Sequence, residues 1–320
     1  MRIFAHANYP FLEWRRRAYI ITAILLLVAI GAIVRNLVEF GSWMKYGVDF
    51  TGGTVVQVAF DRPVTADAVR DAANNDAWEI YEYGGGNEFA IRMPTFDQQT
   101  SNDAGQQVTR TLAPTFGEEN VNIVRTEAVG PKVGDELQQR ALLAIILSMG
   151  VTLIYLAIRF EWRFGVAAVA ATMHDILLTL GFLALIQSEI SIGTVAALLT
   201  VVGYSLNDTI VVFDRIRENL RLPHKDTLIQ VLNRSINETL PRTVLTSVTS
   251  ATVLMALLLL GGPVIRDFTL VLLLGVVIGT FSSIFVASPV LYFIETKWPR
   301  ETHPGKAAAG GPKKRNPAPV

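Results

Sequence analysis

The chain alternates between long apolar runs and one polar stretch. The first apolar run, residues 18–38, stands alone near the N-terminus, and the others follow residue 138. These later runs cover residues 141–158, 164–186, 190–213, 242–260 and 268–293. A helix needs about 20 apolar residues to cross a hydrocarbon core of about 30 Å. The pattern therefore predicts one transmembrane helix and, at residues 139–294, a bundle of five more.

Residues 41–137 show a different pattern, in which short alternating segments replace the long apolar runs. Strands are expected at 54–60, 78–83, 88–93 and 121–128, and helices at 65–74 and 103–116. Thr65 is the expected helix cap, and Gly84-Gly85-Gly86 predicts a turn rather than a phosphate loop. The order βαββαβ is that of a ferredoxin-like domain. We expect an α-helical polytopic membrane protein with one small α+β domain.

Positive charges at the ends of the runs predict the orientation. The arginines at 15–17 place residues 1–17 in the cytoplasm, because Lys and Arg collect on that side. Arg159, Arg163 and the basic residues of 215–234 mark two further cytoplasmic connections, whereas the opposite ones carry only Arg266. Both termini are thus expected inside and the 41–137 domain outside. The tail at 295–320 is rich in Pro, Gly, Ala and Lys, which predicts a disordered cytoplasmic segment.

Composition narrows the class of protein. Hydrophobic residues make up 51% of the chain and charged residues 18%, and 28 basic residues balance 28 acidic ones. No net positive charge draws the chain to nucleic acid, so none is expected as a partner. The absence of cysteine excludes disulfides, thiolate metal sites and cysteine nucleophiles. Neither an HExxH nor a GxSxG pattern occurs, so we expect no catalytic residues, no metal and no enzyme activity.

Asp208 lies within the predicted helix at 190–213, flanked by Asn207 and Thr209. A carboxylate at such a depth costs roughly 2.5–3.5 kcal/mol on insertion scales, so it indicates a functional role. His174-Asp175 lies in the preceding helix. Neighbours on a helix point in different directions, so the dipeptide is not by itself a relay, and a structural role for His174 is favoured over proton transfer.

Arg242, at the expected start of the fifth helix after Pro241, is the natural counter-charge for Asp208, although it is equally suited to be a cytoplasmic anchor. Thr246 shares its face of the helix. If Asp208 and Arg242 approach, proton binding would break their pairing and create a two-state element. Ser247, Thr249 and Ser250 are interpreted as small residues that allow close packing, as is the ridge Gly275, Gly279 and Ser283.

Several motifs occur in order along the chain, and together they resemble the SecF branch of the SecD/SecF family of bacterial protein-export proteins. They are Gly47–Thr54, Arg159–Arg163, His174-Asp175, the stretch from Asn207 to Asn219, and Leu240–Ser247. The family is similar to the resistance-nodulation-division exporters. The resemblance implies a multi-pass protein of the bacterial inner membrane whose 41–137 domain is periplasmic.

The resemblance also implies partners and residue roles. The chain would form a heterodimer with SecD and would act with the SecYEG channel, SecA and, indirectly, YajC or YidC on a translocating preprotein. The proton-motive force would promote export and release, with no cofactor and with sodium left open as the coupling ion. Asp208 would carry the proton, with Arg242 as its partner. A structural turn after the first helix would comprise Asp49, Phe50, Gly52 and Gly53.

Two other functions are alternatives to that of a translocase subunit. Half of a small-molecule or lipid exporter of the resistance-nodulation-division type would share the intramembrane charges, but its periplasmic mass would normally be far larger. A membrane scaffold would use the same charges only to fix the register of its helices. Mutation of Asp208 separates the scaffold from a proton-driven subunit.

Overall fold

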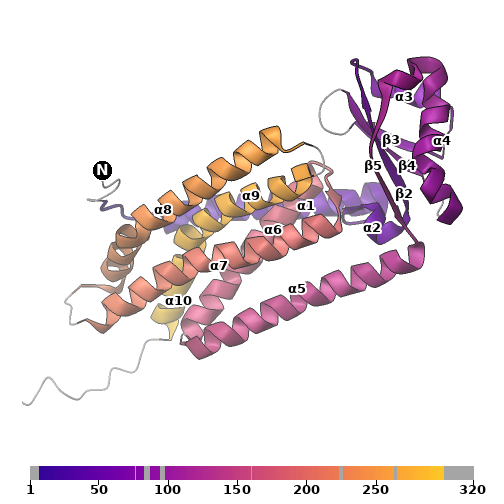
Figure 1. Cartoon of the computed structure of the whole chain (residues 1–320). Coiled ribbons are helices and arrows are strands. Elements are labelled where there is room, and N and C mark those ends of the chain that lie inside the picture. The colour runs from indigo at the N-terminus through magenta and orange to yellow at the C-terminus, as the bar shows by residue number, and fades with distance from the viewer. Residues whose placement is uncertain are drawn as a thin grey trace, which may run out of the picture.

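The computed structural model describes residues 7–75, 77–82, 87–93, 98–159, 161–222, 226–262 and 265–298. Long helices form a bundle, and a small α+β domain stands at one end of it (Figure 1). The predicted turn at 84–86 and the tail from residue 299 onward lie outside the described residues.

Among the described residues, six stretches of helix are long and apolar enough to cross a membrane, as the sequence predicts. They are α1 (Arg15–Phe40), α5 (Pro131–Arg159), α6 (Trp162–Leu185), α7 (Ile192–Arg221), α8 (Leu228–Leu260), and α9 (Arg266–Ser282) with α10 (Ser288–Lys297). A π-helical turn at Ser283–Ala287 joins α9 to α10. Because α10 ends at Lys297, the prediction that the disordered tail begins at 295 is wrong by three residues.

The predicted bounds of the fifth membrane helix are wrong, because α8 begins at Leu228 and not at 242. Thr227 and Gln230 form a capping box that starts the helix well before its apolar part. Pro241 therefore lies inside α8, and Arg242 does not lie at a helix start. Helix α5 also begins earlier than predicted, at Pro131, inside the predicted outer domain. Hydrophobicity marks the part of a helix that meets lipid, and the helix itself extends further.

The segment before α1 packs against the N-terminal part of α8, ahead of its apolar run. The backbone N–H of Tyr9 donates to Asn237 Oδ1 at 2.8 Å, and that of Leu12 donates to Asn233 Oδ1 at 2.9 Å. Phe11 and Leu12 are buried in the bundle core. The N-terminal segment is thus part of the folded bundle.

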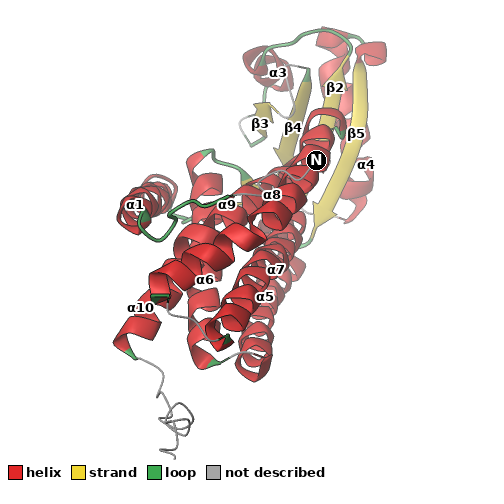
Figure 2. Cartoon of the chain, turned by 90° about the vertical axis from the view of Figure 1, so that its left-hand side faces the viewer, coloured by secondary structure: helices red, strands yellow, loops and turns green. Residues whose placement is uncertain are grey.

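The outer domain has the ferredoxin-like order that the sequence predicts. Its elements are β2 (Gly53–Phe60), α3 (Ala66–Ala73), β3 (Glu79–Glu82), β4 (Glu88–Met93), α4 (Gln98–Phe116) and β5 (Val121–Val129). The strands form an antiparallel sheet in the order β3-β4-β2-β5. Val58, Val69, Phe89 and Leu112 pack between the sheet and the two helices, which cover one face of the sheet (Figure 2).

Two short elements that the sequence did not predict join this domain to the bundle. Strand β1 (Lys45–Tyr46) pairs in parallel with β6 (Glu189–Ile190), which links α6 to α7. The one-turn helix α2 (Val48–Thr51) follows. Gly52 and Gly53 then adopt φ values of 73° and 111°, which only glycine takes without strain, at the position of the predicted turn.

Candidate intramembrane polar site

Small residues bring α7 and α9 into close contact. A Cβ atom at Gly275 would overlap Val201 Cγ2, and one at Gly279 would lie 3.0 Å from Ser205 Cβ. The packing interpretation of this ridge is therefore confirmed. The close approach has a chemical consequence, since short hydroxyl side chains on one helix can reach carboxylates on the next.

The first polar cluster surrounds Asp175 on α6, whose side chain is buried. His174 Nδ1 lies 2.9 Å from Asp175 Oδ1. The hydroxyls of Ser205 on α7 and Ser282 on α9 both donate to Asp175 Oδ2, the latter at 2.7 Å. The expectation that His174 and Asp175 point apart is wrong, because the two side chains bend toward each other. His174 Nε2 is buried without a hydrogen-bond partner in the described structure.

The second cluster surrounds Asp208 on α7, which is also buried. Ser247 Oγ on α8 lies 3.4 Å from Asp208 Oδ2 and 2.8 Å from the Thr243 carbonyl oxygen. Thr280 Oγ1 on α9 donates a hydrogen bond to Ser247 Oγ at 2.7 Å. A serine has one hydroxyl proton, so Ser247 can donate to only one of the two acceptors at a time. Ser247 therefore lies within hydrogen-bond distance of Asp208 in addition to its expected packing role.

The predicted intramembrane residues differ in burial. His174, Asp175, Asp208 and Thr209 are buried together in the bundle. Asn207 and Arg242 are exposed on the single chain, as the burial pattern shows.

Arg242 forms no ion pair with Asp208 among the described residues, and its side chain is exposed on the single chain. Thr246 lies on that same helix and donates to the Arg242 carbonyl oxygen at 2.8 Å. The expected pairing of the two charges is therefore not present in this conformation.

Sequence reasoning did not identify the α9 hydroxyls Thr280 and Ser282 or the α8 hydroxyl of Thr243. A signal was available for the first two, since both lie within the ridge from Gly275 to Ser283. The side chain of Thr243 is buried with its hydroxyl oxygen unpartnered among the described residues. A hydroxyl next to a glycine that contacts an acid-bearing helix is thus a candidate partner of that acid.

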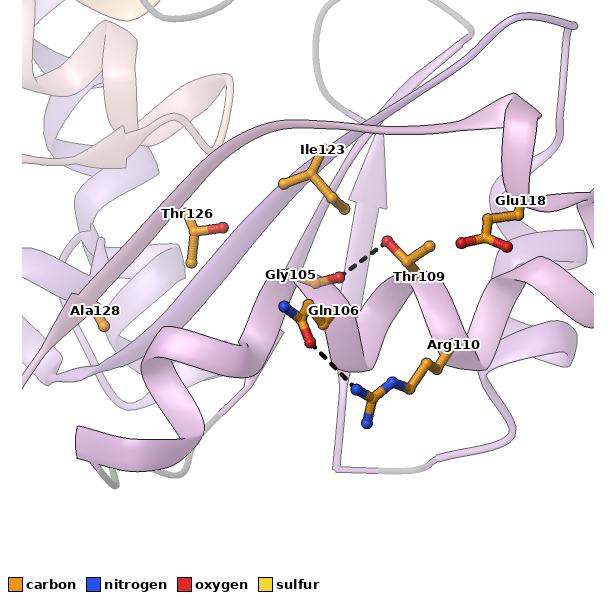
Figure 3. A pocket seen from close by; sticks show the side chains of 8 residues that line it. All are labelled: Gly105, Gln106, Thr109, Arg110, Glu118, Ile123, Thr126 and Ala128. Carbon is orange, nitrogen blue, oxygen red and sulfur yellow. Dashed lines mark hydrogen bonds between the residues drawn. The ribbon is translucent and has the colours of Figure 1, made fainter.

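In the part of the chain that the structure describes, no three metal-ligating side chains come together. A groove of about 840 Å³ lies between α4 and β5 in the outer domain (Figure 3). Its hydrogen bonds, Thr109 to Gly105 and Arg110 to Gln106, run along α4 itself, so they do not build a polar site across the groove.

Glu127 on β5 is a partly buried titratable group of the outer domain. Burial raises the pKa of the Glu127 carboxyl on β5 above its usual 4.5. Arg125 lowers that pKa and the Asp49 carboxylate raises it further. Ionisation of the Glu127 carboxyl therefore costs more free energy in the folded protein than in water.

Spanning helices with a buried acidic core and a small outer domain define a multi-pass membrane protein of the transport type. The family model "Protein export membrane protein SecD/SecF, C-terminal" matches residues 108–297, and "SecD/SecF GG Motif" matches residues 40–64. The chain belongs to the SecD/SecF family.

Relatives and a solved structure agree with this assignment. The chain is 48% identical to the protein translocase subunit SecF of Gemmatimonas aurantiaca over 94% of its length and 91% of that protein, and 40% identical to that of Vibrio alginolyticus, with 89% of each covered. The crystal structure of SecDF, a translocon-associated membrane protein from Thermus thermophilus, matches with a TM-score of 0.81 and 34% identity over 92% of this chain. The match spans 40% of that longer SecDF chain. These findings define a multi-pass inner-membrane protein with an accessory role in protein translocation.

Proposed function

We propose that this chain acts with SecD and uses the proton-motive force to promote the export and release of preproteins across the inner membrane. The relatives named above are protein translocase subunits, which favours a polypeptide over a small molecule as the cargo. The proposal rests on one observation, the buried Asp208 carboxyl and its hydroxyl neighbours.

Asp208 lies in a spanning helix with a serine hydroxyl as its hydrogen-bond partner and with no cation in contact among the described residues. An ionised carboxylate buried in this way is costly, and binding a proton removes that cost. A carboxyl of this kind can be loaded from one side of the membrane and unloaded to the other. One charge moving through 100 mV makes available about 2.3 kcal/mol.

The hydroxyls around Asp208 can respond to its protonation. A protonated Asp208 donates to Ser247 Oγ, and Ser247 then donates to the Thr243 carbonyl oxygen, 2.8 Å away. An ionised Asp208 accepts a hydrogen bond from the Ser247 hydroxyl instead, and the Thr280 hydroxyl, 2.7 Å away, donates a hydrogen bond to Ser247 Oγ. Loss or gain of one proton thus reorders bonds that join α7, α8 and α9.

The exposed polar face of α8 provides a place for the partner. Arg242 is exposed on the isolated chain, as is Thr249. Such a face is costly in lipid and is expected to lie against other helices. We place SecD there, with Arg242 approaching Asp208 in another conformation of the heterodimer.

Proton uptake by reconstituted heterodimers tests the proposal. Vesicles that contain SecD and the wild-type chain, with a pH-sensitive dye inside, should acidify when an inward proton gradient is imposed. Asp208→Asn should abolish the signal, while Asp214→Asn, on the exposed end of the same helix, should retain it. Equal acidification by all three proteins, or a response to a sodium gradient alone, would refute proton coupling at Asp208.

A further inference from the structure

A cavity of about 530 Å³ lies within the membrane-spanning region, between α5 and the pair α6 and α7. Its walls are apolar and include Leu142 and Ile145 on α5, Leu180 on α6, and Leu198 and Val202 on α7. Figure 1 shows α5 running along the edge of the bundle. The volume falls in the range of about 300–1,000 Å³ that is typical of small-molecule sites.

The outer end of this cavity is polar and aromatic. Trp43, Tyr46, Gln138 and Gln139 line it, just past the end of α1 at Phe40. Trp and Tyr are enriched at the level of the lipid headgroups, where one end of the ring meets water. The aromatic end therefore lies at headgroup depth, and the apolar walls extend from it into the hydrocarbon.

Helix α5 leaves this cavity open to the bilayer. It is the least buried of the candidate spans in the described part of the chain. The side chain of Leu142, which lines the cavity, is 61% exposed. Apolar cavities do not hold water stably, and the bilayer supplies hydrocarbon at this depth.

We propose that this cavity is a binding site for one phospholipid. An acyl chain lies between Leu142 on α5 and Leu180 and Leu198 on the facing helices. The headgroup lies at Trp43, and the side-chain amides of Gln138 and Gln139 donate to its ester or phosphate oxygens.

The size of the cavity favours an acyl chain over a helix of the partner. A helix with its side chains is about 10–12 Å wide and rises 5.4 Å per turn. The 530 Å³ available therefore holds little more than one turn. A flexible acyl chain fills a narrow space of this kind along its length.

The site adjoins the polar core without including any of its polar groups. Ile176, which lines the cavity, directly follows Asp175 on α6, and Val202 lies one turn before Ser205 and Leu206 on α7. A bound acyl chain thus braces α6 and α7 beside the two acidic clusters. The lipid site is inferred from the shape and lining of this cavity, and it does not depend on which ion the protein uses.

Photocrosslinking in the purified complex tests the proposal. A diazirine amino acid replaces Leu142 in the cavity or, as a control, Leu147, which is equally exposed on α5 but does not line it. The complex is washed in mild detergent to remove loosely held lipid, irradiated, and analysed by mass spectrometry. We expect a phospholipid adduct at position 142 and none at position 147.

A cavity-filling variant tests whether the adduct at position 142 comes from lipid inside the cavity. Leu180→Trp should remove the adduct at position 142, and the double change Gln138→Ala with Gln139→Ala should reduce it even if Leu180→Trp fails to fold. A phospholipid adduct of equal yield at positions 142 and 147 would show surface lipid only and would overturn the proposal. An adduct with the mass of the partner subunit, or no adduct at position 142, would overturn it as well.

Discussion

Asp49 Oδ2 accepts a hydrogen bond from the backbone N–H of Ile192 at 2.8 Å, and it thereby ties the turn after α1 to the first residue of α7. The first amides of a helix have no partner within the helix, so an acceptor at this point stabilises it. Asp208 lies on the same helix. This hydrogen bond therefore connects the helix that carries Asp208 to the turn that leads into the outer domain.

Removal of this acceptor should loosen the outer end of α7. Loss of a capping acceptor typically costs about 0.5–2 kcal/mol. Asp49→Ala should speed amide hydrogen exchange in the first turn of α7, whereas Asp49→Asn, which keeps an acceptor oxygen, should change it less. Unaltered exchange at Ile192 in Asp49→Ala would show that the hydrogen bond does not stabilise this turn.

The contact between α7 and α9 should be intolerant of added volume. Gly275→Ala places a methyl group against Val201 and should lower stability by about 1–3 kcal/mol, the usual cost of overpacking. The measurement is the unfolding temperature of the purified complex. Gly203→Ala, on α7 with nothing within 4 Å of the new Cβ, is the matched control and should not destabilise.

A compensating change extends this test. Val201→Ala combined with Gly275→Ala should recover part of the lost stability, because it removes the methyl groups that the new Cβ meets. Equal unfolding temperatures for Gly275→Ala and Gly203→Ala would contradict the close packing.

Ser247→Ala removes the hydroxyl that can donate a hydrogen bond to Asp208. Hydrogen bonds to charged groups contribute about 1.5–3 kcal/mol, so proton-driven export should slow by roughly tenfold or more. Thr252→Val is the control, since the Thr252 hydroxyl donates to the Val248 carbonyl of its own helix at 2.8 Å. Initial rates of preprotein export in vesicles give the comparison, and equal rates for Ser247→Ala and Thr252→Val would exclude the hydroxyl from coupling.

Glu127 predicts a pH effect on the outer domain. Its folded-state pKa is raised above 4.5, so the folded protein holds this proton more tightly than the unfolded chain. The stabilising contribution is complete below pH 4.5 and is lost as the pH rises through the folded pKa. Glu127→Gln should therefore gain stability relative to wild type as the pH rises above 4.5. The exposed Glu118→Gln is the control, and a stability difference for Glu127→Gln that falls with rising pH would contradict the sign.

Periodicity along the chain predicted most of the fold. The strand Glu88–Met93 and the cap at Thr65 have their predicted positions, because alternation and capping are local signals. The start of α8 was not predicted from hydropathy, since Leu228 to Leu240 is helical but belongs to the part before the apolar run. The pairing of β1 with β6 was also missed, because it joins residues about 144 positions apart through two-residue strands.

The acidic residues of the site were found from sequence, but their partners were not. Asp208 and Asp175 are conspicuous because a carboxylate in an apolar run is costly. Ser282 and Thr280 look like ordinary packing residues, and only the approach of α9 to α7 brings their hydroxyls to the acid-bearing helices. The outward position of Arg242 depends on helix rotation, which charge complementarity alone does not determine.

Vesicle export at a clamped membrane potential measures whether protonation of Asp208 drives export, as we propose. Inverted inner-membrane vesicles carry the translocase with SecD and either the wild-type chain or Asp208→Asn, and preprotein export is measured with and without a proton-motive force. We predict that Asp208→Asn keeps its association with SecD and its ATP-driven export but loses the stimulation by the proton-motive force. Full stimulation in Asp208→Asn would contradict the account.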